Sequence, residues 1–126
     1  MQRVIDRHFD LALHPNLTSL FMGSWQIDGN LGITTAVTEM LLQSHAGEIN
    51  LLPALPAKYP DGSVTGLRAR GGYEVDIFWK GGKLTKAMIK ADRKKGDETI
   101  PVRYGDIVKS VKLAKGHTVV LDGSLE

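Results

Sequence analysis

The sequence predicts an α+β protein in which a short helical N-terminal segment precedes an antiparallel, β-sandwich-like domain. Before residue 46, hydrophobic side chains recur about every 3.6 residues, which is the period of a helix. After residue 46 they recur at every second residue, which is the period of a strand. The charge changes at the same place. Two basic and four acidic side chains give residues 1–45 a formal charge of −2, whereas fourteen basic and ten acidic ones give residues 46–126 a charge of +4. We therefore expect a helical segment at 1–45 and a β-domain at 46–126.

Two helices are predicted in the first segment. The apolar face of the first is formed by Val4, Ile5, His8, Phe9, Leu11 and Ala12. It should end before Pro15, because proline disfavours helix in the residue that precedes it. The spacing of Ile33, Val37, Met40, Leu41 and Ser44 predicts a second helix from about Gly32 to His45, and Gly47 stands where a left-handed C-terminal cap is expected.

Short strands separated by turn residues fill the second segment. The stretch from Gly47 to Ser63 contains three prolines and an Asp-Gly turn, so it predicts one short strand and a looped crossing. Alternating apolar residues predict a strand from Tyr73 to Lys80, and Gly81-Gly82 supplies the positive φ angles of a tight hairpin. The further predicted strands cover 84–91, 100–104, 107–113 and 117–121, with a solvated hairpin tip at Arg93-Lys94-Lys95.

Composition excludes several classes of function. The chain has 126 residues, 42% of them hydrophobic and 24% charged, which is typical of one soluble globular domain. It has no cysteine, so disulfides and thiolate metal sites are excluded. A net charge of +2 does not indicate a nucleic-acid partner, and the short apolar runs do not indicate a membrane partner. No signal peptide is recognisable, and the localisation stays open.

The polar stretch Gln26-Ile27-Asp28-Gly29-Asn30 directly precedes the second predicted helix. Asp and Asn commonly cap helices by accepting a hydrogen bond from an amide near the helix start. The residues alone therefore favour a capping role for Asp28 or Asn30 over a catalytic one. Histidines at 8, 14, 45 and 117 lack the i, i+4 spacing of a helical zinc site, so no metal or other cofactor is expected. The aromatic residues Trp25, Trp79, Tyr59 and Tyr73 could stack on sugars, but a core position is the commoner role.

A longer pattern resembles the C-terminal portion of family-95 glycoside hydrolases, over about residues 13–125. The segments that carry the resemblance are Gln26-Ile27-Asp28-Gly29-Asn30, Glu39-Met40-Leu41-Leu42-Gln43-Ser44-His45, Leu51-Leu52-Pro53-Ala54-Leu55-Pro56 and Gly66-Leu67-Arg68-Ala69-Arg70-Gly71-Gly72. These enzymes are inverting α-L-fucosidases that remove α-1,2-linked fucose from glycans. The resemblance implies that residues 1–45 are the last piece of an (α/α)₆ catalytic barrel and that a C-terminal β-domain follows. A fucosylated glycan or oligosaccharide is then the expected partner.

The resemblance also implies that Asp28 is the active-site aspartate, with Gln26 and Asn30 contacting the sugar. In that family, asparagines polarised by the aspartate hold the attacking water, and a glutamate elsewhere is the acid; no residue here matches them. Met22-Gly23-Ser24-Trp25 departs from the His-Pro-Pro-Phe type of segment usual before the motif, and Leu31 replaces an aromatic residue. These departures affect the expected substrate contacts.

Three functions remain open on the sequence. The chain is a catalytically incomplete piece of a fucosidase, a stand-alone carbohydrate-binding β-domain, or a protein-interaction domain. The first is favoured, because Trp79 alternates with charged neighbours and looks buried rather than available as a platform. The isolated chain is expected to be inactive, since Glu39 would lie roughly 15 Å along the helix from Asp28. It is also expected to self-associate through its helical segment.

Overall fold

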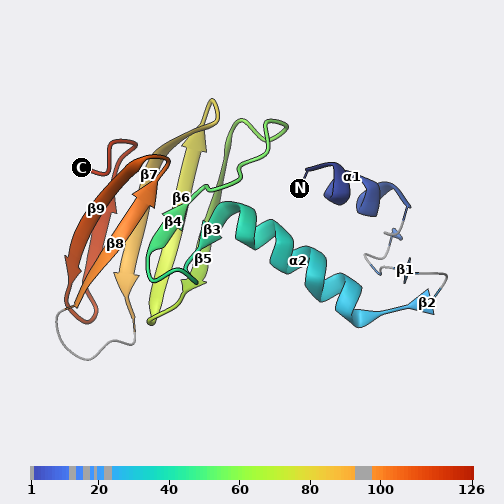
Figure 1. Ribbon diagram of the computed structural model, residues 1–126, viewed down its shortest axis with the longest axis horizontal. Coiled ribbons are helices and arrows are strands. Elements are labelled where there is room, and N and C mark those ends of the chain that lie inside the picture. Colours follow the sequence, from blue (N-terminus) through green and yellow to red (C-terminus); the bar gives the residue numbers. More distant parts are fainter. Residues whose placement is uncertain (1, 12–13, 16–17, 19, 22–23, 93–97) are drawn as a thin grey trace. The chain divides into compact units, whose positions relative to one another are not determined.

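The structure, a computed structural model, describes residues 2–11, 14–15, 18, 20–21, 24–92 and 98–126. The chain divides into two compact units, residues 1–38 and residues 39–126. Figure 1 shows the helices of the first unit and the sheets of the second. The expected hairpin tip at Arg93-Lys94-Lys95 and the segment Met22-Gly23 lie outside the described residues.

The first unit contains the predicted short helix, α1, over Gln2–Leu11. After it the backbone N–H of His14 donates to the carbonyl oxygen of Thr18 at 2.9 Å. Two very short strands, β1 (Leu20–Phe21) and β2 (Ser24–Trp25), then pair antiparallel. No side chain described in residues 2–38 is buried. The side chains of this unit whose burial is described are all exposed or half-buried.

The second helix, α2, covers Ile27–Leu41, so the predicted bounds of about Gly32 to His45 were wrong at both ends. At its start, a carboxylate in the first turn stabilises the unpaired N–H groups of the helix. At its end, the apolar stripe predicted helix as far as His45. Residues Leu42–Gln43 form strand β3 there, because they pair with a neighbouring strand. Gly47 has a φ of +80°, but it belongs to the turn after β3 and does not cap the helix.

The second unit consists of two four-stranded sheets (Figure 1). One sheet is antiparallel throughout, in the order β10-β7-β6-β5. Its strands are β5 (Gly62–Ala69), β6 (Tyr73–Lys80), β7 (Lys83–Ala91) and β10 (Thr118–Leu121). The predicted hairpin at Gly81-Gly82 is confirmed, with φ angles of +59° and +73°. Strand β5 was not predicted, because its exposed residues obscure any alternation.

The other sheet has the order β3-β4-β8-β9 and is mixed. Besides β3, its strands are β4 (Ile49–Leu51), β8 (Glu98–Tyr104) and β9 (Ile107–Leu113). The pairing of β4 with β8 is parallel, so the prediction of a purely antiparallel domain was wrong at this pair. Alternation identifies a strand but carries no information on the direction of its partner.

A single hydrophobic core joins the two sheets, which is consistent with the predicted β-sandwich. The alternation predicted for β6 is confirmed, with Tyr73, Val75, Ile77 and Trp79 all buried. The completely buried side chains of the core are Tyr73, Ile49, Leu51, Ile77, Ile89, Leu121, Leu125, Val75 and Val102.

The C-terminal turn completes this core. One carboxylate oxygen of Asp122 accepts hydrogen bonds from the N–H of Ser124 at 2.8 Å, its hydroxyl at 2.7 Å and the N–H of Glu126 at 3.1 Å. These bonds fold the last residues back on the chain. Leu125, at a φ of +63°, is fully buried as a result.

Candidate functional site

The three residues predicted to form a site lie at the N-terminal end of α2 (Figure 1). Gln26 directly precedes the helix and is exposed, Asp28 is exposed in its first turn, and Asn30 is half-buried. Successive helical residues turn by about 100°, so Asn30 projects about 200° around the axis from Asp28. The helix therefore brings these residues to one end but directs Asp28 and Asn30 to different sides.

Asp28 is inside α2 rather than at its cap. The helix begins at Ile27, so the capping role that the residues alone favoured is not the one observed. The carboxylate instead stands in the first turn, where the aligned N–H groups favour negative charge. Its side chain is exposed.

Large apolar side chains surround this helix start. Trp25, Ile27 and Leu31 are 57%, 54% and 63% exposed. Ile27 and Leu31 are four residues apart and therefore share one side of the helix. Exposed apolar surface of this kind marks an interaction site or a surface that other protein covers. We refer to these three residues below as the Trp25 patch.

The threonines of α2 add to this apolar character. The hydroxyls of Thr34, Thr35 and Thr38 donate to the carbonyl oxygens four residues earlier, at 3.0, 2.9 and 3.0 Å. Each hydroxyl is thereby turned toward the backbone, which leaves the methyl group to face outward. A helix whose apolar side chains extend around much of its circumference is usually buried in a larger body.

The other segments quoted for the resemblance meet in the second unit. The N–H of Leu52 donates to the Leu41 carbonyl at 2.8 Å, and that of Ala54 to the Met40 carbonyl at 3.1 Å. These two bonds satisfy carbonyl groups that the end of α2 leaves without helical partners. Arg70 donates its backbone N–H to the hydroxyl oxygen of Ser44 at 2.9 Å. The segments around 39–45, 51–56 and 66–72 are thus joined by hydrogen bonds and act as scaffold.

Ion pairs in the second unit lie on the surface of the sheets. Arg68 contacts Glu74 and Asp92, each at 2.8 Å. Arg103 donates to both oxygens of Glu48, at 2.7 and 3.1 Å. The hydrogen bonds from Arg103 hold the pKa of the Glu48 carboxyl below its ordinary value, against the opposing effect of desolvation.

The aromatic residues divide into two groups. Tyr73 and Trp79 are buried in the core, and the indole N–H of Trp79 donates to the Tyr59 carbonyl at 3.0 Å. Trp25 and the Tyr59 ring are exposed. Within the described residues, no group of three His, Cys, Asp or Glu side chains could hold a metal ion. Nor is any helix among the described residues long and apolar enough to cross a membrane.

Comparison with known proteins identifies similar sequences over most of the chain. Residues 43–121 match the model of "Glycoside hydrolase family 95, C-terminal domain". Alpha-L-fucosidase 2 of Arabidopsis thaliana is 36% identical over 121 residues, which cover 95% of this chain. Probable alpha-fucosidase A of Aspergillus oryzae is 42% identical over 67 residues, which cover 45% of this chain. Probable alpha-fucosidase A of Aspergillus niger is 33% identical over 112 residues, which cover 75% of this chain.

The matched region is a small part of these relatives. The chain spans 14% of the length of the Arabidopsis thaliana protein, and 9% and 14% of the Aspergillus oryzae and Aspergillus niger proteins. The resemblance that the sequence indicated is confirmed by these matches.

Proposed function

Because this chain belongs to glycoside hydrolase family 95, whose C-terminal domain its residues 43–121 match, we propose that it forms the C-terminal part of a hydrolase that acts on α-L-fucosides. The main support is the similarity to Alpha-L-fucosidase 2, which extends over 95% of the chain but over only 14% of that relative. The proposed substrate is a fucosylated glycan or oligosaccharide.

Residues 1–45 are, in this proposal, the last part of a catalytic (α/α)₆ barrel. The exposed Trp25 patch supports this, as does the lack of a buried side chain among the described residues of 2–38. A helix with an exposed apolar surface is stabilised when a larger body covers it. The β-domain that follows would then support the barrel rather than carry the chemistry.

Asp28 is the proposed catalytic residue, and Gln26 and Asn30 are the proposed sugar contacts. Inversion at a glycosidic carbon needs an acid that protonates the leaving oxygen while the carbon–oxygen bond breaks. It also needs a base that accepts a proton from the water attacking the opposite face. The accessible carboxylate of Asp28 suits the base side, and the exposed Gln26 amide can hydrogen-bond a sugar hydroxyl. The acid would come from the rest of the barrel.

The 126-residue chain should therefore be inactive by itself. Each missing proton-transfer group typically costs a factor of about 10²–10⁴ in rate. Incubation of the chain with 2′-fucosyllactose should release no fucose above the level of a heat-treated sample. Release that disappears in Asp28→Asn would contradict the proposed incompleteness of the site.

The catalytic assignment is tested in a longer protein that contains this chain and the barrel. Asp28→Asn should lower kcat by at least about 10²-fold, whereas the matched change Asp10→Asn on the exposed side of α1 should not. Normal kcat in Asp28→Asn would disprove the role of Asp28 and leave the family assignment intact.

Self-association of the isolated chain is proposed through the Trp25 patch, since nothing in the described residues buries those side chains. Sedimentation velocity should show mass increasing with concentration, and Leu31→Ser should reduce it. A monomer at high concentration would contradict this proposal.

A further inference from the structure

The sequence contains three Asp-Gly pairs, Asp28-Gly29, Asp61-Gly62 and Asp122-Gly123. In such a pair the peptide nitrogen of glycine can attack the side-chain carboxyl carbon of the aspartate, because glycine has no side chain that obstructs a close approach. The attack requires the aspartate to leave its folded conformation and its carboxyl group to leave its hydrogen bonds. The structure restrains the three pairs to different degrees.

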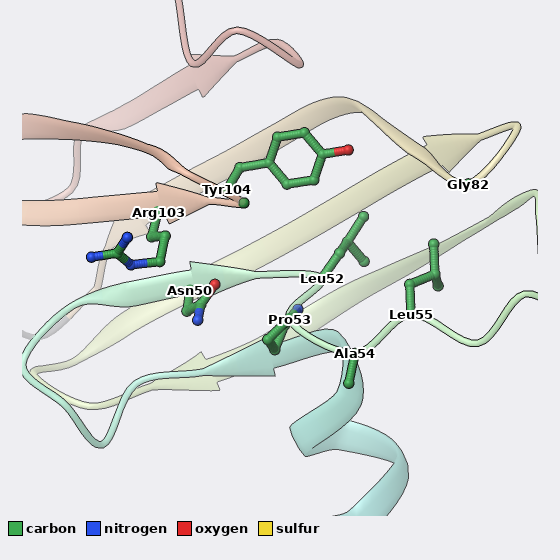
Figure 2. Close-up of a pocket in the computed structure, with 9 residues that line it drawn as sticks. Asn50, Leu52, Pro53, Ala54, Leu55, Gly82, Arg103 and Tyr104 are labelled. Atoms are coloured by element: carbon green, nitrogen blue, oxygen red, sulfur yellow. The ribbon is translucent and has the colours of Figure 1, made fainter. Parts of the chain in front are cut away.

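The pair Asp61-Gly62 is held at both residues. One carboxylate oxygen of Asp61 accepts the N–H of Gly81 at 2.6 Å. Figure 2 shows the hairpin that carries this donor, at Gly82, beside a pocket of about 450 Å³ in the second unit. Gly62 lies so close to the Trp79 indole that an added Cβ would overlap the ring. The peptide between Asp61 and Gly62 therefore has little room to rotate toward ring closure.

The pair Asp122-Gly123 carries more hydrogen bonds. One oxygen of Asp122 accepts two hydrogen bonds from Ser124 and one from the N–H of Glu126. A Cβ on Gly123 would lie 2.6 Å from the carbonyl oxygen of Leu84, so this backbone is also closely packed. Each hydrogen bond that has to open first lowers the rate of ring closure by about tenfold. Both pairs of the second unit should therefore react slowly.

The pair Asp28-Gly29 lacks these restraints. Within the described part of the chain, the exposed carboxylate of Asp28 has no hydrogen bond or ion pair. The first four N–H groups of an α-helix have no partner within the helix, and that of Gly29 is one of them because α2 begins at Ile27. The ends of helices also open at little cost in free energy. Asp28 should therefore leave its folded conformation far more often than Asp61 or Asp122.

We propose that Asp28-Gly29 is a site of spontaneous conversion of aspartate to isoaspartate, and that the other two pairs are protected from it. The Gly29 nitrogen forms a bond to the side-chain carboxyl carbon of Asp28 and loses its proton. The carboxyl group loses its hydroxyl, so one water molecule is released and a cyclic imide is formed. Water then opens this ring. Attack at the side-chain carbonyl restores aspartate, whereas attack at the main-chain carbonyl gives isoaspartate, with no net change in mass.

The product differs from aspartate in geometry. The main chain then runs through the former side chain and is one carbon longer, and the free carboxylate is attached directly to Cα. An added backbone carbon breaks the regular i to i−4 hydrogen bonding of a helix. The first turn of α2 would be lost, and the carboxylate would be displaced. The inference does not rest on the proposed catalytic role of Asp28, because ring closure needs only the Asp-Gly pair. If that role is correct, isomerisation also inactivates the site.

The test is to age the 126-residue chain at neutral pH and body temperature. Samples are digested with a protease that cleaves before aspartate but not before isoaspartate. Cleavage before Asp28 should be lost progressively, whereas cleavage before Asp61 and Asp122 should persist. In water enriched in heavy oxygen, the uncleaved peptide should gain a heavy oxygen atom, because water opens the imide. The variant Gly29→Ala should keep the cleavage before Asp28, because its methyl group obstructs ring closure.

A parallel incubation in guanidinium chloride separates the effect of structure from that of sequence. All three pairs should isomerise there at similar rates, since the hydrogen bonds of Asp61 and Asp122 are lost. In the folded chain, three results would each overturn the proposal: persistent cleavage before Asp28, loss before Asp61 or Asp122 as fast as before Asp28, or equal loss in Gly29→Ala. These measurements need no fucoside, so such a failure leaves the proposed hydrolase function intact. Asp28→Asn in a longer protein tests that function separately.

Discussion

Leu125 should contribute to stability far more than its place beside the chain end suggests. Leu125→Ala removes three carbon atoms from a fully buried side chain. At about 0.8 kcal/mol per buried methylene, the lost transfer free energy is about 2.4 kcal/mol. A residual cavity adds to this, and measured Leu→Ala changes in cores span about 2.7–5 kcal/mol. Because the terminal turn can partly collapse, we expect about 3 kcal/mol.

The assay is urea unfolding followed by tryptophan fluorescence. The chain has two tryptophans, so Trp25→Phe leaves Trp79 in the core as the reporter. The urea midpoint should fall in Leu125→Ala with an unchanged m-value. Val120→Ala is the matched control, because Val120 is 55% exposed on β10, and it should change the free energy of unfolding by about 0.5 kcal/mol.

Leu125→Gly separates burial from backbone strain. A φ of +63° costs an L-residue about 1 kcal/mol that glycine does not incur. The glycine variant should therefore be no less stable than the alanine variant, although it loses one more carbon. A loss below 1 kcal/mol in Leu125→Ala, with the fold intact, would refute the reasoning that Leu125 closes the core.

Gly62→Ala should destabilise the fold by about 1–3 kcal/mol in the same urea assay, since an added Cβ would overlap the Trp79 indole. Gly32→Ala should instead raise α2 helicity by circular dichroism, because its Cβ would meet nothing within 4 Å. Asp122 accepts hydrogen bonds from Ser124 and from the Glu126 N–H. These bonds, that from the Ser124 side chain most of all, lower the pKa of Asp122 in the folded state. Their stabilisation is present above the ordinary aspartate pKa of about 4 and is lost as pH falls through the lower folded pKa. Melting at several pH values should show the gap between the unmodified chain and Asp122→Asn closing in acid; a constant gap would contradict this.

The parts of the fold that the sequence predicted are those encoded in local patterns. The alternation of Tyr73 to Trp79 and the Gly81-Gly82 pair specify β6 and its hairpin without reference to distant residues. Leu42 and Gln43 lie within the helix that the stripe predicted, yet they form β3 because Leu42 pairs with Leu51. A tertiary partner decided the conformation there, and local periodicity could not reveal it.

The same distinction applies to the sites. Gln26, Asp28 and Asn30 are adjacent in sequence, so a motif could place them at one helix start. Asn50 and Arg103 are far apart in the sequence and become neighbours only through the parallel pairing of β4 with β8. No spacing in the sequence indicates that pairing, so it became visible only in the structure.

The parallel pairing of β4 with β8 also has a consequence for the order of folding. Strands β5, β6 and β7 follow one another as hairpins, whose closure is fast because their partners are near in the chain. Strand β4 can pair early with β3, its neighbour in the chain. Its pairing with β8 closes a loop that contains the whole meander, and closing a longer loop costs more entropy. The antiparallel sheet should therefore gain amide-exchange protection first during refolding, and β4 with β8 later. The bidentate contact between Arg103 and Glu48 spans this strand pair, so it should form in the same late step.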